Sequence, residues 1–219
     1  MKKLELIGEV KLDHLATFHA QTYDALATDY EARVEALRPV TTYALSMLTK
    51  ELQPGDRILD VGCAVGYTLE ILEEQGMRPE GIDISENMIE RARLRNPGLD
   101  IRCEDFFEAK YDSQSYHAVL MYAFIHLFPK TVALVGLAKA AHILKPGGHA
   151  FLSTTLSNIP SEGFETKADY DSAPKRFRKR WTREEFEQAI SETGFEVVRN
   201  EDLTDEFGKV WMDYVVRKQ

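Results

Sequence analysis

Hydrophobic and polar positions alternate in two different periods along most of the chain. The apolar run at residues 57–61 follows a Pro-Gly-Asp turn signal and predicts a strand. The same criteria predict further strands at residues 81–84, 99–103, 117–121 and 149–154, and helices at residues 66–75, 85–93 and 130–144. Because strands and helices alternate at the spacing of βαβ units, the pattern predicts a parallel sheet with right-handed crossovers.

The two ends of the chain follow other patterns. Residues 1–50 carry helical spacing, and Pro39 stands where a helix start is expected. A capping box at residues 182–185 opens another predicted helix. The apolar runs at residues 195–199 and 209–216 predict two final strands. Their connection is too short for a crossover helix, so this pair is expected to be antiparallel.

Three aspartates fall near the ends of the first three predicted strands. Asp60, Asp83 and Asp105 are separated by 23 and 22 residues. Carboxyl ends of parallel strands meet at one edge of a sheet, where open α/β folds bind ligands. The alternative is that aspartates are common in loops after strands, which explains one of them more easily than three.

Composition restricts the protein class. The chain has 219 residues, 44% hydrophobic and 29% charged, which is typical of a folded globular protein. A net charge of −9 argues against a broad nucleic-acid footprint but leaves a local basic patch possible. Cys63 and Cys103 form no disulfide framework or metal-ligand cluster, so we expect a reducing, cytoplasmic compartment and no metal. No apolar run approaches the ~20 residues of a membrane span.

The segment between Asp60 and Gly66 carries the strongest chemical signal. A predicted strand runs into a glycine turn and then a helix, and Gly62 and Gly66 permit close backbone approach to a ligand. The helix start offers free N–H groups. Asp83, at the end of the next strand, is placed to accept hydrogen bonds from two ribose hydroxyls.

This motif resembles that of the class I S-adenosylmethionine-dependent methyltransferases, in their small-molecule branch. Asp60, Gly62, Ala64 and Gly66 match the family's first motif, with Ala64 in place of the middle glycine. Nicotinamide dehydrogenases are the competing class. Their Gly-x-Gly-x-x-Gly turn needs a third glycine that this segment lacks, and an antiparallel final pair is foreign to their fold.

Other segments extend the resemblance over most of the chain. Asp83-Ile84 matches the ribose acid and the adenine-packing residue, and Glu104-Asp105-Phe106 matches the segment at the adenine edge. Residues 144–148 match the turn before the fifth strand, and residues 23–30 are similar to the family's N-terminal lid.

The resemblance implies an α/β, Rossmann-like fold: a seven-stranded mixed sheet with helices on both faces, its last strand antiparallel, and a helical N-terminal lid. It implies one domain over residues 1–219. The expected parts are a lid (1–50), a cofactor-binding core (51–155), a substrate-side connection (156–183) and a C-terminal helix and strand pair (184–219).

The implied cofactor is S-adenosyl-L-methionine, with S-adenosyl-L-homocysteine as product. The expected cofactor-binding residues are Asp60, Gly62, Cys63, Ala64, Gly66, Asp83, Ile84, Asp105, Phe106, Met121 and Tyr30. Asp60 and the glycines would hold the methionine end, Asp83 the ribose and Asp105 the adenine amine. The alternative for Asp105 is a cap of the turn after the third strand.

Two residues are catalytic candidates. His126 follows the fourth strand at the ligand edge, and an imidazole near pH ~6.5 suits general-base work. The alternative is a histidine at a helix start that packs on the sheet. Tyr23 is the second candidate. It lies seven residues before Tyr30 on one face of a helical lid, where both rings could close over the sulfonium. The alternative is that both dock the lid onto the core.

Residues 175–183 hold six basic residues in nine positions. In this family the connection after strand five builds substrate walls, so the stretch favours an anionic substrate. The alternative is a solvated connector. The expected substrate residues are Tyr122, Tyr170, Arg180 and Trp181.

The implied reaction is methyl transfer to a nitrogen or oxygen of a small molecule. Enzymes of this fold that methylate amino groups of nucleic acids carry an Asp/Asn-Pro-Pro-Tyr motif after the fourth strand. Residues 121–124 are Met-Tyr-Ala-Phe instead, which argues against that class of enzyme. A tRNA or protein methyltransferase, and a non-catalytic S-adenosylmethionine-binding regulatory partner, stay as alternatives, and an aminopropyl-transferring relative is disfavoured. We expect a small-molecule acceptor as partner, no membrane or nucleic-acid contact, and a monomer or homodimer.

Overall fold

The computed structural model of the chain describes residues 12–166 and 175–219. Seven strands form one sheet in the order β3-β2-β1-β4-β5-β9-β8. Their bounds are β1 Arg57–Val61, β2 Arg78–Asp83, β3 Ile101–Cys103, β4 Tyr116–Tyr122, β5 Leu144–Thr155, β8 Phe195–Thr204 and β9 Val210–Lys218. The first five run parallel, and β9 is antiparallel to both β5 and β8. The predicted mixed sheet is confirmed.

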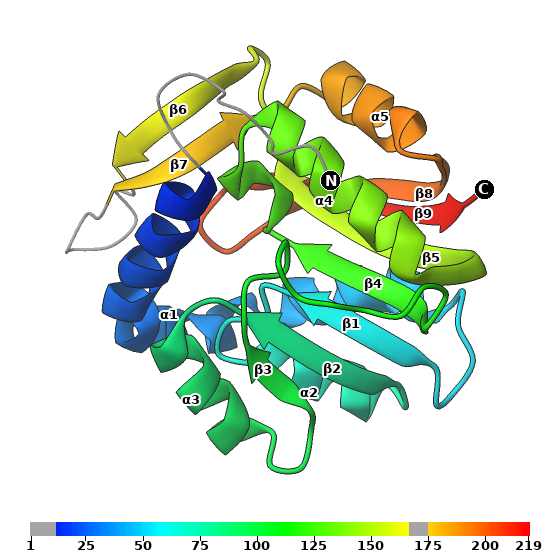
Figure 1. The fold of residues 1–219 in the computed structure, drawn as a ribbon, viewed down its shortest axis with the longest axis horizontal. Coiled ribbons are helices and arrows are strands. Elements are labelled where there is room, and N and C mark those ends of the chain that lie inside the picture. Colours follow the sequence, from blue (N-terminus) through cyan, green and yellow to red (C-terminus); the bar gives the residue numbers. More distant parts are fainter. Residues whose placement is uncertain (1–11, 167–174) are drawn as a thin grey trace.

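Helices cover both faces of this sheet (Figure 1). They are α1 Leu12–Thr49, α2 Tyr67–Glu74, α3 Glu86–Arg95, α4 Lys130–Ile143 and α5 Arg183–Glu192, with a single-turn helix η1 Ile125–Leu127 after β4. Successive strand side chains point to opposite faces. Leu59 therefore packs in the core under α4 and α5, whereas Ile58 packs in the core under α1, α2 and α3.

Residues Leu12–Thr49 form one helix, α1, which contains Pro39. The expectation of a helix start at Pro39 is wrong. The helix continues through it because residues on either side are packed: Val34 before the proline and Leu45 after it are both buried. Figure 1 shows the first half of α1 on the side toward which the arrowheads of β2 and β4 point, and its last turns behind the sheet.

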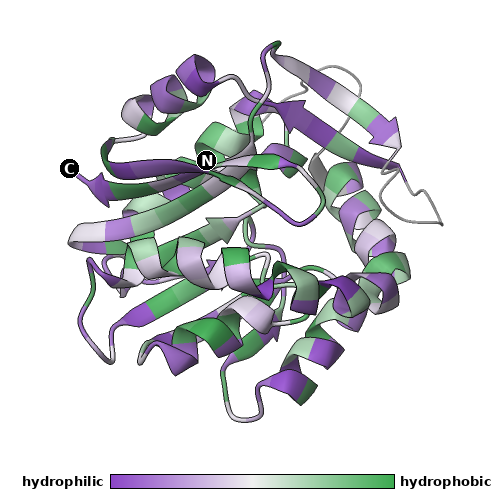
Figure 2. Cartoon of the chain, turned by 180° about the vertical axis from the view of Figure 1, so that it is seen from behind, coloured by the Kyte–Doolittle hydropathy of each residue, from purple (hydrophilic) through white to green (hydrophobic). Residues whose placement is uncertain are grey.

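A two-stranded hairpin follows β5, where the sequence indicated only a long connection. Its strands are β6 Ser161–Thr166 and β7 Lys175–Arg180, paired antiparallel with Phe164 opposite Phe177. The hairpin rests on α1, since Thr22 Oγ1 donates to the Lys175 carbonyl at 3.2 Å. Figure 2 shows that much of β7 is hydrophilic, which is why apolar periodicity did not indicate a strand there.

Within the described ranges, no helix is long and apolar enough to cross a bilayer.

Candidate active site

The turn after β1 is built on three left-handed residues. Gly62 has φ of 76°, Ala64 of 48° and Gly66 of 77°. A Cβ on Gly62 would lie 2.8 Å from Cδ2 of Phe124, and one on Gly66 would lie 2.5 Å from Nδ2 of Asn96. Backbone conformation and lack of space thus require glycine at both positions. Ala64, which stands in place of the motif's middle glycine, adopts the left-handed conformation with its side chain.

Asp83 joins this turn to the end of β2. Its Oδ2 accepts a hydrogen bond from the Ala64 amide at 3.0 Å, and its Oδ1 accepts one from the Ser85 amide at 2.9 Å. Burial raises the pKa of Asp83, and the backbone amides oppose that rise. A carboxylate with two oxygens has about four acceptor sites, so lone pairs stay available for a ligand.

Asp60 lies beneath the turn, and its side chain is 1% exposed. Its Oδ2 accepts a hydrogen bond from Thr68 Oγ1 at 2.5 Å, which ties the end of β1 to the start of α2. Burial raises the pKa of Asp60 to about 7. The carboxyl group therefore supports the turn by joining β1 to α2.

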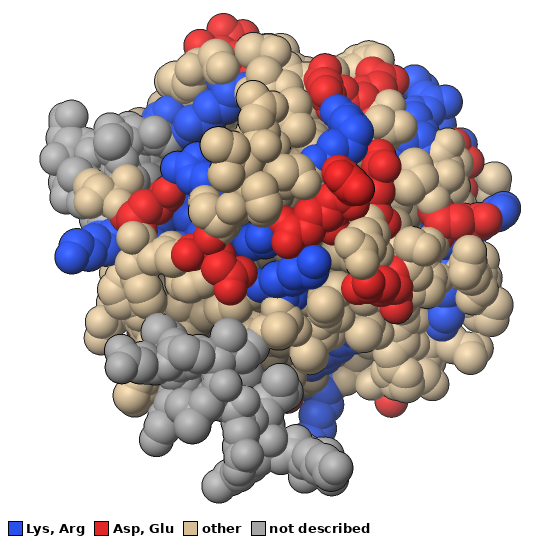
Figure 3. Space-filling view, turned by 90° about the horizontal axis from the view of Figure 1, so that it is seen from above, with Lys and Arg blue, Asp and Glu red and all other residues tan. Residues whose placement is uncertain are grey.

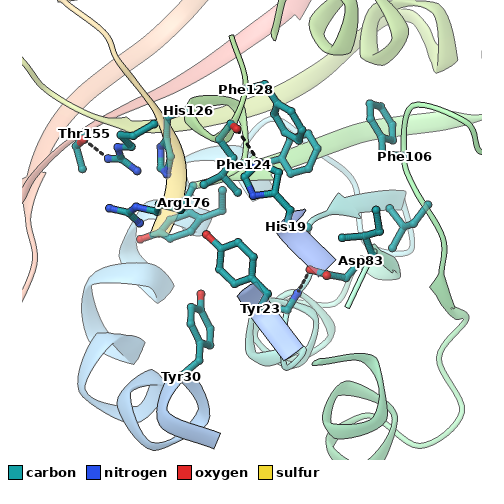
Figure 4. A pocket seen from close by; sticks show the side chains of 18 of the residues that line it. His19, Tyr23, Tyr30, Asp83, Phe106, Phe124, His126, Phe128, Thr155 and Arg176 are labelled. Atoms are coloured by element: carbon teal, nitrogen blue, oxygen red, sulfur yellow. Dashed lines mark hydrogen bonds between the residues drawn. The ribbon is translucent and has the colours of Figure 1, made fainter. Parts of the chain in front are cut away.

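A cavity opens above this turn, at the carboxyl ends of β1, β2 and β4. Residues of α1, η1, β7 and the β8–β9 turn enclose it (Figure 4). The predicted residues that line it are Gly62, Ala64, Asp83, Ile84, Asp105, Phe106, Tyr23, Tyr30, Tyr122 and His126. Cys63 and Met121 have buried side chains in the core, and with Asp60 and Gly66 they do not belong to the described lining.

Asp105 fits both readings that the sequence allowed. It lines the cavity at the end of β3. Its Oδ1 also accepts a hydrogen bond from the Phe107 amide at 2.8 Å, so it caps the local turn. One carboxylate oxygen can do this while the group borders the cavity.

Tyr23 and Tyr30 both reach into the cavity from α1 (Figure 4). Burial raises the pKa of Tyr23, so its hydroxyl is neutral at pH 7. The neighbouring Asp24 anchors this part of α1, because its Oδ1 accepts hydrogen bonds from Ser85 Oγ at 2.6 Å and from the Asn87 amide at 3.1 Å. The lid helix is thus fastened directly behind the loop that carries Asp83.

His126 lies in η1 and is 2% exposed. Its Nδ1 is 3.1 Å from Oγ1 of Thr154, and its ring centroid is 6.0 Å from that of Trp211. The ring lines the cavity and also packs beside the sheet. The structure therefore keeps both interpretations of this residue, and its catalytic role stays a prediction.

His19 is a cavity residue that the sequence interpretation missed. Its Nε2 lies 2.9 Å from the Leu127 carbonyl oxygen, which only accepts, so Nε2 carries the proton. Its Nδ1 is buried and finds no hydrogen-bond partner within residues 12–166 and 175–219. Burial lowers the pKa of His19 to about 4, and the ring is neutral at pH 7. Its position four residues before Tyr23, on the same helix face, was the available signal.

The basic stretch contributes different residues from those expected. Arg176 and Arg178 line the cavity. Trp181 is fully buried and packs against Phe186, with ring centroids 5.5 Å apart, and it is not among the residues that line the cavity. Arg180 is exposed and pairs with Glu165 at 2.6 Å.

The cavity lining therefore contains Arg176 and Arg178 from this stretch, and not Arg180 or Trp181 as expected. Trp181 directly precedes Thr182, the N-cap of α5, and its side chain packs in the core. Arg180 is not among the residues that line the cavity. Tyr170, the remaining predicted substrate residue, lies outside the described residues.

Three features occur together in this structure: a left-handed glycine turn, an acidic residue after β2 and the strand order of the sheet. Known proteins with similar sequences point to one family. The family model described as "Methyltransferase domain" matches residues 28–200. The chain belongs to the methyltransferase domain family. The class I fold expected from the sequence is confirmed with it.

Relatives of this methyltransferase domain differ in their named acceptors. A "Ubiquinone biosynthesis O-methyltransferase" of Xylella fastidiosa (strain 9a5c) is 31% identical over 150 residues, covering 66% of this chain and 58% of that protein. A "24-methylenesterol C-methyltransferase 2" of Oryza sativa subsp. japonica is 29% identical over 168 residues, covering 70% of this chain and 45% of that protein. This domain thus spans about half the length of these relatives.

Among solved structures, the Burkholderia thailandensis 1,6-didemethyltoxoflavin-N1-methyltransferase matches with a TM-score of 0.78 at 17% identity. The match covers 98% of this chain and 93% of that one, which contains bound 1,6-didemethyltoxoflavin and S-adenosylhomocysteine. At this identity the likeness establishes the fold over nearly the whole methyltransferase domain.

Proposed function

We propose that this domain transfers the methyl group of S-adenosylmethionine to a nitrogen or oxygen of a small molecule, releasing S-adenosylhomocysteine. One observation carries the proposal. The Gly62 turn and Asp83 share a single enclosed cavity with Tyr23, His19 and Arg176, which come from α1 and β7. A cofactor-type turn and a separate polar wall therefore face the same space (Figure 4).

The residues present fit the cofactor. Asp83 has acceptor capacity for two ribose hydroxyls, and Gly62 borders the cavity beside it, where the methionine portion would lie. Ile84 and Phe106 offer apolar flanks for the adenine, with Asp105 at its edge. Asp60 supports this arrangement from below through Thr68.

The cofactor supplies an activated methyl group, so the protein's task is alignment and exclusion of water. Bound there, S-adenosylmethionine would supply an electrophilic methyl carbon to the lone pair of the acceptor atom, and the electron pair of the broken carbon–sulfur bond would remain on sulfur. Tyr23 and Tyr30 present aromatic faces suited to a sulfonium. His126 is proposed as the base that receives the acceptor's proton.

His19 is proposed as a positioning residue. Its tautomer leaves Nδ1 as a hydrogen-bond acceptor, which suits an N–H or O–H group of the incoming molecule. An unpaired buried nitrogen is costly, and a ligand donor would satisfy it.

A macromolecular acceptor is less consistent with the surface. On the face shown in Figure 3, acidic and basic side chains lie interspersed, whereas nucleic-acid-binding domains usually display a basic field. A tRNA or protein acceptor and a purely regulatory role therefore stay secondary. Cytoplasmic residence and a monomer or homodimer complete the proposal.

The test is release of S-adenosylhomocysteine from S-adenosylmethionine in the presence of phenols, heteroaromatic N–H compounds and amines, each assayed separately. Turnover with one class, lowered at least tenfold in His126→Ala while S-adenosylhomocysteine affinity is kept, supports both the reaction and the base. If turnover occurs and His126→Ala leaves it unchanged, His126 is not the base. If a tRNA pool is methylated and no small molecule is, the acceptor class proposed here is wrong.

A further inference from the structure

Strand β7 places two arginines on the same wall of the cavity. Arg176 and Arg178 are two residues apart in an extended strand, so their side chains leave the same face. Both are strongly buried: the Arg176 side chain is 11% exposed and Arg178 is 6% exposed. Two positive charges this deep need an anion nearby or cost considerable free energy.

The described protein partners do not neutralise the pair. Arg178 donates to a neutral group, the Thr155 hydroxyl, and forms no ion pair with any residue in the described ranges. Arg176 reaches Glu165 only at 3.5 Å, and its Nε is buried without a partner among the same residues. Burial, with a smaller contribution from the nearby Arg176, lowers the pKa of Arg178 to about 9. The wall therefore carries unbalanced positive charge.

The acidic residues of the cavity are committed elsewhere. Asp83, Glu104 and Asp105 follow β2 and β3, and Figure 4 shows Asp83 across the cavity from Arg176. Asp205 lies in the β8–β9 turn, where its oxygens accept hydrogen bonds from the Trp211 indole at 2.9 Å and from two amides of its own turn. The cavity is thus acidic at the turn-and-ribose end and basic at the β7 end.

We propose that Arg176 and Arg178 form an anion subsite that holds the carboxylate of a planar aromatic acceptor. This inference rests on the proposed function and names the substrate class of the same site. Guanidinium forks match a carboxylate in shape and donor spacing.

The walls of the cavity support the aromatic part of the molecule. Phe124 and Phe128 lie with ring centroids 4.9 Å apart, and the rings of Tyr122 and Trp211 are stacked at 5.8 Å. All four line the cavity. Flat apolar walls beside two arginines favour an aromatic acid over an aliphatic phosphate.

The cofactor's own carboxylate is the competing anion. Arg33 and Tyr30 also line the cavity, from the middle of α1, and offer that group an alternative. The two occupants are separated by asking whether an aromatic carboxylate binds together with S-adenosylhomocysteine or is displaced by it.

The experiment is calorimetric titration of benzoate, and separately of benzamide, into the protein with and without saturating S-adenosylhomocysteine. Benzamide has the shape of benzoate without its charge. We expect benzoate to bind the S-adenosylhomocysteine complex at least tenfold more tightly than benzamide. Equal affinities, no benzoate binding, or displacement of benzoate by S-adenosylhomocysteine would each overturn the subsite.

Variants locate the effect. Arg176→Gln and Arg178→Gln should each weaken benzoate binding at least tenfold, because charge-assisted hydrogen bonds are lost. Arg180→Gln makes the same change one step along the same face of β7, outside the cavity, and should leave the affinity within about twofold. Equal losses in all three variants would contradict the assignment.

The proposed function fails separately from the subsite. If the wild-type protein does not bind S-adenosylhomocysteine, the proposed methyltransferase function is wrong. Benzoate titrated alone still tests whether Arg176 and Arg178 bind a carboxylate. If Arg178→Gln does not fold, Arg176→Gln and the comparison of benzoate with benzamide on the wild-type protein decide the question.

Discussion

The Nε2 of His19 lies 2.9 Å from the Leu127 carbonyl oxygen, and this contact sets which ring nitrogen faces the cavity. The bond joins the first turns of α1 to η1, the segment that also carries His126. It leaves Nδ1 as a buried acceptor without a partner in the described part of the chain. One hydrogen bond thus fastens the lid helix and prepares a polar atom for a ligand.

Two substitutions separate these functions of His19. His19→Gln keeps an amide donor near the position of Nε2 and loses the atom at Nδ1, whereas His19→Asn does the reverse. If Nδ1 positions the acceptor, His19→Gln should lower kcat/KM at least tenfold with S-adenosylhomocysteine affinity kept, and His19→Asn should retain more activity. The opposite order of activities would show that only the Leu127 bond matters.

Stability should depend on pH through the same ring. The pKa of His19 falls from 6.5 to about 4 on folding, so the unfolded chain binds a proton that the folded one resists. The stability associated with neutral His19 is full above pH 6.5 and is lost as pH falls toward 4, by about 2–3 kcal/mol at pH 4.5. Asp60, whose pKa is raised to about 7, acts oppositely: its contribution is lost as pH rises from about 4 to 7.

The His19 contribution is isolated by comparing the wild-type protein with His19→Gln in urea unfolding at pH 7 and at pH 4.5. Because both proteins contain Asp60, its effect cancels in the difference. We expect the variant to gain stability relative to wild type on acidification. A difference that does not change between the two pH values would show that the ring is not buried as a neutral group.

Gly62→Ala should damage the cofactor turn by two effects. A side chain at φ of 76° is strained by about 1–3 kcal/mol, and its Cβ would lie 2.8 Å from Phe124. Gly76→Ala is the matched control, since Gly76 has φ of 83° and open space around a Cβ. Both should lose stability in urea unfolding, but only Gly62→Ala should lose S-adenosylhomocysteine affinity, and equal affinities in the two variants would argue against a cofactor at this turn.

Asp24→Ala should loosen the lid. It removes the acceptor for Ser85 Oγ and for the Asn87 amide, at a cost of about 1–3 kcal/mol. Hydrogen exchange of α1 amides should quicken, and S-adenosylhomocysteine affinity should fall several-fold. Asp29→Ala, an exposed change on the same helix, is the control. Unchanged exchange in Asp24→Ala would mean that other contacts hold the helix.

The central sheet could be predicted from the sequence because its strands are buried on both faces and are therefore short, continuous apolar runs. Ile58 and Leu59 belong to opposite cores, and both are apolar for that reason. The glycines of the first turn could also be predicted, since a left-handed backbone restricts residue type. Asp83 could be predicted from its place at the end of the next strand.

Residues brought in by the lid and hairpin were harder to predict. Arg176 and Arg178 differ from Arg180 only in how β7 lies against the cavity, which is tertiary information. His19 looks like any polar residue on an amphipathic helix until the Leu127 carbonyl is placed beside it. Trp181 was misassigned because proximity to a capping box indicates a fixed position but not whether that position faces the core or the cavity.

The most direct test of the account is S-adenosylhomocysteine binding measured by calorimetry for the wild-type protein, Asp83→Ala and Glu90→Ala. Asp83 faces the cavity, whereas Glu90 is exposed on α3 and outside it. We predict micromolar-range binding that weakens at least tenfold in Asp83→Ala and is unchanged in Glu90→Ala. A folded wild-type protein that binds no S-adenosylhomocysteine, or binds it equally well without Asp83, would contradict the account.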